Sequence, residues 1–147
     1  MHLVLRSSKA KGEWSFLRKK NYLAIESILV RFSARHGVRI LHAANVGNHL
    51  HLHIRLDSRR SYRPFIRAVT AAIMMAVTGR SRWSKRVQSK GATSQPVSAQ
   101  KFWDYRPFTR IVVGFRAVLG LRDYIAINRL EGSGVSRETA RVLVRSG

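Results

Sequence analysis

Polar and apolar side chains alternate strictly from His49 to Ile54, where the sequence reads His-Leu-His-Leu-His-Ile. A period of two residues is typical of a β-strand that is buried on one face. The three histidines therefore share one face, and Leu50, Leu52 and Ile54 share the other, which we expect to lie on a core under helices. A face of three imidazoles can bind a borderline divalent metal ion. The alternative is three hydrated histidines on an open sheet face.

The pattern around this strand predicts the order β-α-β-β-α-β-α. We expect strands over residues 2–6, 38–46, 49–56 and 102–113, and helices over residues 22–36, 59–78 and 115–129. Asn21 is the expected N-cap of the first helix, and Gly37 and Gly79 are expected to end the first two helices. The order is that of a ferredoxin-like sandwich, an α+β fold with a central antiparallel β-sheet and helices on one face. The histidine strand is expected to be central in this sheet.

The chain is strongly basic, with 28 lysines and arginines against 7 acidic residues and a formal net charge of +21. A folded domain with this charge repels itself unless a polyanion binds it. The basic residues are spread along the whole chain, which favours nucleic acid over an acidic membrane surface.

Residues 79–100 are rich in arginine, lysine, serine and glycine, and we expect them to form a long basic loop. Such a loop can contact backbone phosphates while one base stacks on its single tryptophan. The alternative is a disordered, hydrated loop. The candidate contacts are Arg80, Arg82, Trp83, Lys85 and Arg86.

The chain contains no cysteine, which excludes disulfides, thiolate zinc sites and a cysteine nucleophile. This composition fits a reducing cytoplasm. The longest apolar run, residues 71–77, is too short to span a membrane, and residues 1–5 read as a strand rather than a secretion signal. We therefore expect a cytoplasmic protein without a membrane partner.

The third predicted helix carries the best candidate for a nucleophile. Tyr124 and Asn128 are four residues apart, so they share a helix face beside the apolar stripe of Val118, Leu121 and Ile125. A phenol there can be directed at a phosphate bound to a metal ion, and the amide oxygen of Asn128 can reach the same ion. Two histidines leave coordination positions open, as catalysis requires. The alternative is an ordinary boundary tyrosine with its hydroxyl in water.

Residues 46–52, Val-Gly-Asn-His-Leu-His-Leu, resemble the His-hydrophobic-His signature of the HUH single-strand DNA nucleases. Residues 102–103, with Arg106 and residues 110–112 after them, resemble the tryptophan-containing strand that precedes the catalytic helix in one branch. Residues 124–128 resemble the Tyr-Ile-x-x-Asn of that branch, the single-tyrosine HUH transposases and in particular the REP-associated tyrosine transposases. The match runs in order from residue 2 to residue 128.

This resemblance implies a catalytic domain over residues 1–130 and a short C-terminal tail over residues 131–147. The implied activity is a metal-dependent endonuclease or transposase that cleaves and rejoins single-stranded DNA through a 5′-phosphotyrosine, in DNA transposition or REP-element processing. By position, Tyr124 is the nucleophile, His49, His51 and Asn128 bind Mg²⁺ or Mn²⁺, and Arg106 contacts DNA. The implied partner is single-stranded DNA near a hairpin, bound by a monomer or homodimer at the bacterial nucleoid.

Several alternatives stay open. His53 allows the pair His51 and His53 in place of His49 and His51, and Tyr105 is a second candidate nucleophile. A non-catalytic RNA-binding module would share the basic ferredoxin-like architecture, but its sheet would display aromatic side chains rather than histidines. A purely structural metal-binding protein would leave the charge unexplained.

Overall fold

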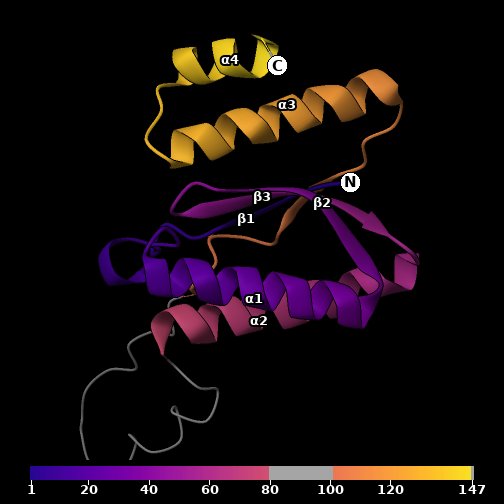
Figure 1. The fold of residues 1–147 in the computed structure, drawn as a ribbon. Coiled ribbons are helices and arrows are strands. Elements are labelled where there is room, and N and C mark those ends of the chain that lie inside the picture. Colours follow the sequence, from indigo (N-terminus) through magenta and orange to yellow (C-terminus); the bar gives the residue numbers. More distant parts are fainter. Residues whose placement is uncertain (80–100, 147) are drawn as a thin grey trace, which may run out of the picture.

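The computed structural model describes residues 1–79 and 101–146 and confirms an α+β fold on one antiparallel sheet (Figure 1). Its strands are β1 (His2–Arg6), β2 (Val38–Asn45), β3 (His49–Leu56) and β4 (Phe108–Arg110). Its helices are α1 (Lys19–His36), α2 (Tyr62–Thr78), α3 (Phe115–Gly132) and α4 (Arg137–Ser146), with 3-10 turns at Gly12–Trp14 and Arg59–Ser61. The sheet order β2-β3-β1-β4 is that of a ferredoxin-like sandwich, and the histidine strand β3 is central as predicted.

The apolar face of β3 lies on the core, as its alternation predicts. Leu50, Leu52 and Ile54 are at most 2% exposed, and they pack with side chains of β1, α1 and α2. Full burial of such a side chain stabilises the fold by roughly 1.5–3 kcal/mol. The other large core residues include Leu3, Leu5, Phe16, Ile25, Phe65, Val69 and Ile73.

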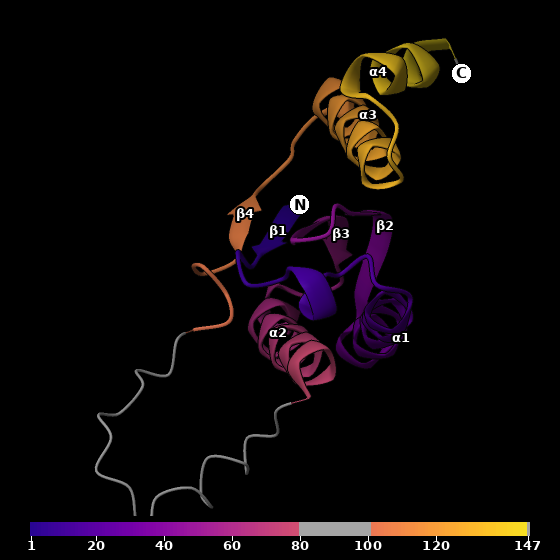
Figure 2. The same cartoon turned by 90° about the vertical axis from the view of Figure 1, so that its left-hand side faces the viewer.

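Helix α3 covers the opposite face of the sheet, so the molecule has a third layer beyond the two of a plain sandwich. Figures 1 and 2 show α1 and α2 on one side of the sheet and α3 on the other, with α4 outside α3. Leu121 and Ile125 of α3 pack on Ala44 of β2 in a small second cluster. A Cβ on Gly132 would lie 2.3 Å from the Asn45 carbonyl oxygen, so only glycine lets the end of α3 approach β2 this closely.

The expected boundary at residue 130 falls inside α3, which continues to Gly132. Helix α4 then packs on α3 and buries Ala140 completely. The C-terminal residues are therefore structurally continuous with α3 up to residue 146.

The first two helices end as predicted, at Gly37 and Gly79, which both adopt the left-handed conformation. The start of α1 was predicted wrongly. The helix begins at Lys19, and Asn21 is a buried residue within it rather than its N-cap. The Asn21 amide donates hydrogen bonds to the carbonyls of Glu13 and Ser15, at 2.9 and 2.8 Å, and so holds the preceding segment. No helix of the described ranges is both long enough and apolar enough to cross a bilayer.

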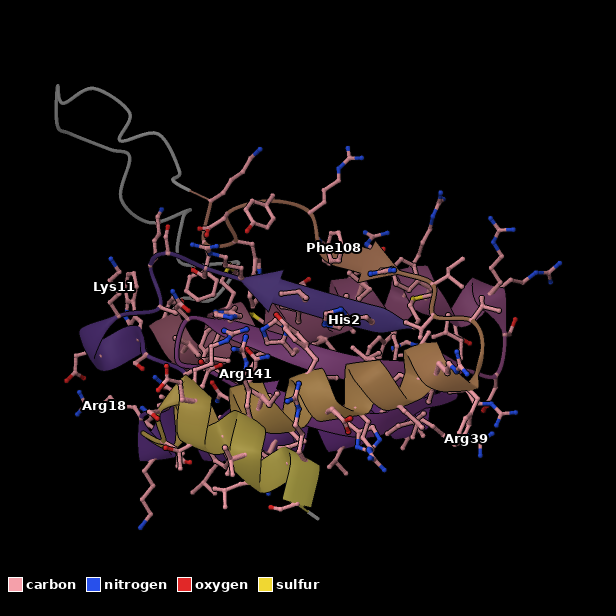
Figure 3. All side chains as sticks on the ribbon, turned by 90° about the horizontal axis from the view of Figure 1, so that it is seen from above. His2, Lys11, Arg18, Arg39, Phe108 and Arg141 are labelled. Atoms are coloured by element: carbon pink, nitrogen blue, oxygen red, sulfur yellow. The ribbon has the colours of Figure 1, made fainter. Side chains whose placement is uncertain are left out.

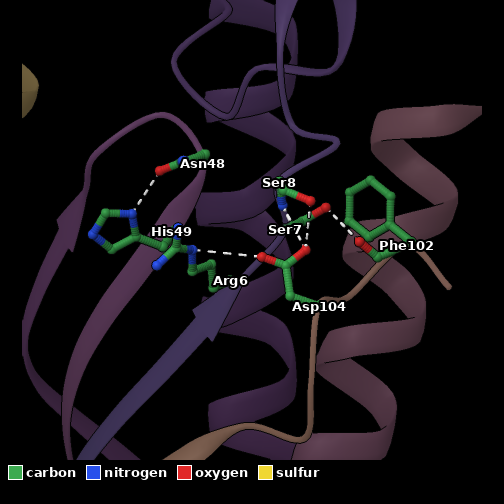
Figure 4. A network of polar contacts seen from close by, with 7 residues as sticks. All are labelled: Arg6, Ser7, Ser8, Asn48, His49, Phe102 and Asp104. Atoms are coloured by element: carbon green, nitrogen blue, oxygen red, sulfur yellow. Dashed lines mark hydrogen bonds and ion pairs between the residues drawn. The ribbon is translucent and has the colours of Figure 1, made fainter.

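The long strand predicted over residues 102–113 is also wrong, because only Phe108–Arg110 pairs with β1. Pro107 cannot donate a ladder hydrogen bond, and the residues before it bond to other parts of the chain (Figure 4). The Ser7 hydroxyl donates to the Phe102 carbonyl, the Ser8 N–H donates to Asp104 at 2.7 Å, and the Trp103 indole donates to the Thr70 carbonyl. These bonds take the place of the expected ladder.

Candidate active site

Five histidines from three strands gather on the face of the sheet that α3 covers. The antiparallel register sets His53 opposite both His2 and His42, so the strands contribute imidazoles to one face. The ring centroids are 5.5 Å apart for His2 and His51, 5.6 Å for His42 and His53, and 4.8 Å for His49 and His51. Figure 3 views the molecule from the α3 side, where His2 lies beside the α3 ribbon.

His51 lies at the centre of this cluster and is 4% exposed. Its Nδ1 is 3.3 Å from His2 Nε2, and its buried Nε2 has no hydrogen-bond partner. Burial, followed by the neighbouring His49 and His2, lowers the pKa of His51 to about 4. The ring is therefore neutral at pH 7. A neutral imidazole with one unused nitrogen is what a metal ligand requires.

His49 is half-buried and lies beside the β2–β3 turn. Its Nδ1 is 2.6 Å from Asn48 Oδ1 (Figure 4). Because an amide oxygen only accepts hydrogen bonds, Nδ1 carries the proton and Nε2 keeps a free lone pair. Burial, and then the positive charge of Arg6, lowers the pKa of His49. An outer hydrogen bond of this kind fixes the tautomer of a metal-binding histidine.

The two candidate histidine pairs, His49 with His51 and His51 with His53, differ in their surroundings. The rings of His49 and His51 contact each other, whereas His53 stacks on His42 at the other end of the cluster. His53 is also 4% exposed, and its Nδ1 has no partner. Burial lowers its pKa first, followed by the N-terminal ammonium group, His42 and His2.

Tyr124 extends from α3 onto this cluster. Its ring lies edge-to-face with His51 at 5.3 Å and with His2 at 5.8 Å between centroids. The residue is 38% exposed, so solvent and a ligand can reach it. The structure therefore brings the predicted nucleophile against one of the two predicted histidine ligands.

Asn128 is one helical turn beyond Tyr124 and is 5% exposed. Its Nδ2 donates to the Tyr124 carbonyl at 2.7 Å, and its Oδ1 takes no part in that bond. One further turn along the helix, Gly132 contacts Asn45, just before the turn into β3. Asn128 therefore lies between two contacts of α3 with β2, that of Ile125 with Ala44 and that of Gly132 with Asn45.

The site residues offer neutral nitrogen and oxygen donors that could hold a divalent ion. Among residues 1–79 and 101–146, no three histidine, aspartate or glutamate side chains are grouped to hold a metal ion. The candidate donors are the imidazoles of His49 and His51 and the amide oxygen of Asn128. The buried, unpartnered Nε2 of His51 fits this use. Three neutral donors leave coordination positions open for phosphate oxygens.

The other predicted site residues lie elsewhere. Arg106 is exposed in the segment before β4. Tyr105 is 56% exposed and makes no ring contact with a histidine of the described chain. The basic-loop candidates, Arg80, Arg82, Trp83, Lys85 and Arg86, lie outside the described residues.

Sequence reasoning missed the contributions of β1 and β4. His2, Val4 and Arg6 alternate on β1 and lie opposite His53, His51 and His49. Phe108 and Arg110 continue the same face on β4. The alternation of residues 2–6 was visible in the sequence, but the strand pairing that sets His2 opposite His53, and its ring against that of His51, was not.

Comparisons of the chain with protein-family models, with curated proteins and with solved structures found no match.

Proposed function

We propose that this protein is a metal-dependent single-strand DNA endonuclease of the transposase type, with Tyr124 as its nucleophile. The supporting observation is the contact of the Tyr124 ring with His51, whose neighbour His49 completes the predicted histidine pair. The predicted nucleophile and the two candidate histidine ligands, which come from distant parts of the sequence, thus belong to one cluster of ring contacts. The substrate is DNA of a bacterial nucleoid, as the resemblance to the HUH transposases implies.

In the proposed reaction, the phenolic oxygen of Tyr124 attacks the scissile phosphorus. A P–O bond forms to the tyrosine and the bond to the 3′-oxygen breaks, which leaves a 5′-phosphotyrosine and a free 3′-hydroxyl. The phenol loses its proton to solvent, and the departing 3′-oxygen gains one. A divalent ion held by His49, His51 and Asn128 would withdraw charge from the phosphate oxygens. Attack by a 3′-hydroxyl on the phosphotyrosine reverses the step, because the covalent link conserves the phosphodiester bond energy.

Arginines at the edges of the histidine face support a polyanionic substrate. Arg6 is paired with His49 across β1 and β3, and Arg110 is paired with His2 across β4 and β1. A phosphate that reaches both Tyr124 and His51 has to enter between α3 and the sheet. A flexible single strand can do this more readily than a stiff duplex.

A sheet-based RNA-binding module is the weaker alternative. Such modules stack bases on exposed aromatic residues of the central strands. Here α3 lies over the corresponding face, and the two central strands present His2, His51 and His53 there.

A denaturing gel tests the proposed function. Single-stranded oligonucleotides with a randomised region are incubated with the protein and Mg²⁺ or Mn²⁺, and a protein–DNA adduct that survives denaturation is expected. Tyr124→Phe removes one oxygen and should eliminate the adduct, as should EDTA, whereas the matched variant Tyr105→Phe should retain it. A wild-type protein that forms no adduct with either ion contradicts the proposal.

A further inference from the structure

A cleft of about 680 Å³ lies next to Tyr124. It is bounded by β4, by the segment that joins β4 to α3, and by the first half of α3. His2 and Tyr124 belong to its walls, so the cleft opens directly beside the histidine cluster. Its volume lies within the range of sites for small organic ligands.

One wall of the cleft is apolar and unusually exposed. Phe108 is 52% exposed although it lies in a strand, and Ile111 and Val113 are 75% and 79% exposed. The Phe108 ring contacts His2 edge-to-face, with 6.4 Å between centroids. An exposed aromatic ring on an apolar wall can stack with a nucleic-acid base of any sequence.

The charge of the cleft suits an anion. Arg110 is the charged residue in its wall, no acidic side chain contributes to it, and Arg110 forms no ion pair with an acid of the described residues. A guanidinium without a partner offers several N–H donors to a phosphate.

Gly120 keeps the α3 wall of the cleft low. It lies in the middle of α3, where glycine is roughly 0.5–1 kcal/mol less stable than alanine. A Cβ at this position would meet no atom within 4 Å, so packing does not require glycine here. The missing side chain therefore leaves room for a ligand rather than for another part of the fold.

We propose that this cleft binds one unpaired nucleotide of a DNA strand, next to the phosphate that Tyr124 attacks. The base stacks on Phe108, and Arg110 holds the phosphate of the same nucleotide. The position relative to the cleaved bond rests on the proposed function, whereas the binding itself does not require cleavage.

The test measures binding in EDTA, so that no cleavage occurs. The probe is a fluorescent oligo-dT strand, and anisotropy gives its dissociation constant. Phe108→Ala and Arg110→Ala should each weaken binding about ten-fold. The matched controls, Phe115→Ala and Arg116→Ala, remove an exposed aromatic ring and an exposed guanidinium outside the cleft, and should change the affinity less than about two-fold.

A second oligonucleotide of the same length, in which every nucleotide is abasic, separates stacking from charge. Phe108→Ala should have no effect on its binding, because there is no base to stack, whereas Arg110→Ala should still weaken it. Equal losses for Phe108→Ala on both strands, or losses of the same size in the two controls, would overturn the proposal.

Gly120→Leu approaches the cleft from the opposite wall and keeps the proposal testable if Phe108→Ala disturbs β4. Leucine favours the helix, so the thermal midpoint should not fall, while oligo-dT binding should weaken about ten-fold because the cleft is filled. Unchanged binding by a folded Gly120→Leu protein would overturn the proposal.

The cleft and the proposed function can fail separately. If Phe108→Ala loses base-dependent binding but the wild-type protein never forms the covalent adduct, the cleft is supported and the proposed function is rejected. If the wild-type protein forms the adduct and Phe108→Ala binds oligo-dT normally, the proposed function is supported and the nucleotide-binding cleft is rejected.

Discussion

Over residues 50–54, the two faces of β3 are similarly buried but chemically opposite. Leu50, Leu52 and Ile54 on one face are at most 2% exposed, and His51 and His53 on the other are 4% exposed. The leucine face buries only hydrocarbon. The histidine face buries His51 Nε2 and His53 Nδ1 without a partner. A buried polar atom without a hydrogen bond is unfavourable by roughly 1–3 kcal/mol, so this face is not built for stability.

The helical layers that cover the two faces also differ in how many hydrophobic residues they bury. Among the described residues, the leucine face packs under α1 and α2 in a core of 17 buried hydrophobic residues. The buried cluster between α3 and the sheet has three, Ala44, Leu121 and Ile125, with the partly buried Val112 packed against them. A face with weak apolar cover and unpartnered polar atoms is typical of a site that exchanges a ligand.

The largest contrast is expected from His51→Leu. This change removes a predicted metal ligand and should lower adduct formation at least about a thousand-fold, because a metal ion contributes several kcal/mol to such reactions. The free energy of unfolding should stay the same or rise, since an unpartnered polar atom is replaced by hydrocarbon. Gel assays and urea titrations measure the two quantities. His53→Leu is the matched control and should keep its activity; loss of activity in His53→Leu as well as in His51→Leu would favour the pair of His51 and His53.

On the opposite face of the same strand, Leu52→Ala should have the complementary effect. Leu52 is 0% exposed, and removing its side chain leaves a cavity that lowers the free energy of unfolding by about 2–5 kcal/mol. At temperatures where the variant stays folded, adduct formation should be close to that of the wild type. A folded Leu52→Ala protein without activity would show that the two faces are coupled.

Acid should weaken the histidine face selectively. Burial lowers the His51 pKa from 6.5 to about 4. Between pH 4 and pH 6.5, His51 is therefore protonated in the unfolded chain and neutral in the folded protein. The contribution of His51 to the free energy of unfolding is complete above pH 6.5. It falls by up to about 3 kcal/mol as the pH falls towards 4. His2, His49 and His53 shift in the same direction. Urea titrations in EDTA should show this loss for the wild type and a smaller one for His51→Leu.

The parts of the fold that could be predicted from sequence are those set by local pattern. The alternation of residues 49–54 gave the strand and its two faces, and the glycines at 37 and 79 gave two helix ends. The strand predicted at residues 102–107 was wrong because these residues bond to groups that are far away in the sequence, including Ser7 and Thr70.

The candidate site was only partly readable for the same reason. The pairing of Tyr124 with Asn128 is a local helical spacing, and the bond from Asn128 Nδ2 to the Tyr124 carbonyl bears out their shared position. The placement of α3 over the histidine face depends on tertiary contacts of Leu121, Ile125 and Gly132. Helical periodicity gives the face of a helix, and it does not give the surface on which that face packs.

The smallest expected effect concerns His2, the histidine that the strand register adds to the site. His2 Nε2 lies 3.3 Å from His51 Nδ1, and if it accepts the His51 proton, Nε2 of His51 keeps its lone pair. His2→Leu removes this acceptor and should lower the Mn²⁺ affinity about ten-fold, the usual effect of losing an outer partner of a metal-binding histidine. His2→Gln offers an amide oxygen in place of the ring nitrogen and should restore most of it. Calorimetry gives the affinities, and ¹⁵N chemical shifts of the imidazoles report the His51 tautomer.

His42→Leu is the matched control, because His42 stacks on His53 and not on His51. It removes an imidazole from the same face and should leave both the Mn²⁺ affinity and the His51 tautomer unchanged. A comparable loss in His42→Leu would mean that general packing of the histidine face, rather than the bond between His2 and His51, sets the affinity. Wild-type affinity in His2→Leu would show that His51 holds its orientation without His2. The edge-to-face contacts of His51 with His49 on the same strand and with Tyr124 on α3 would then be the remaining restraints on the ring.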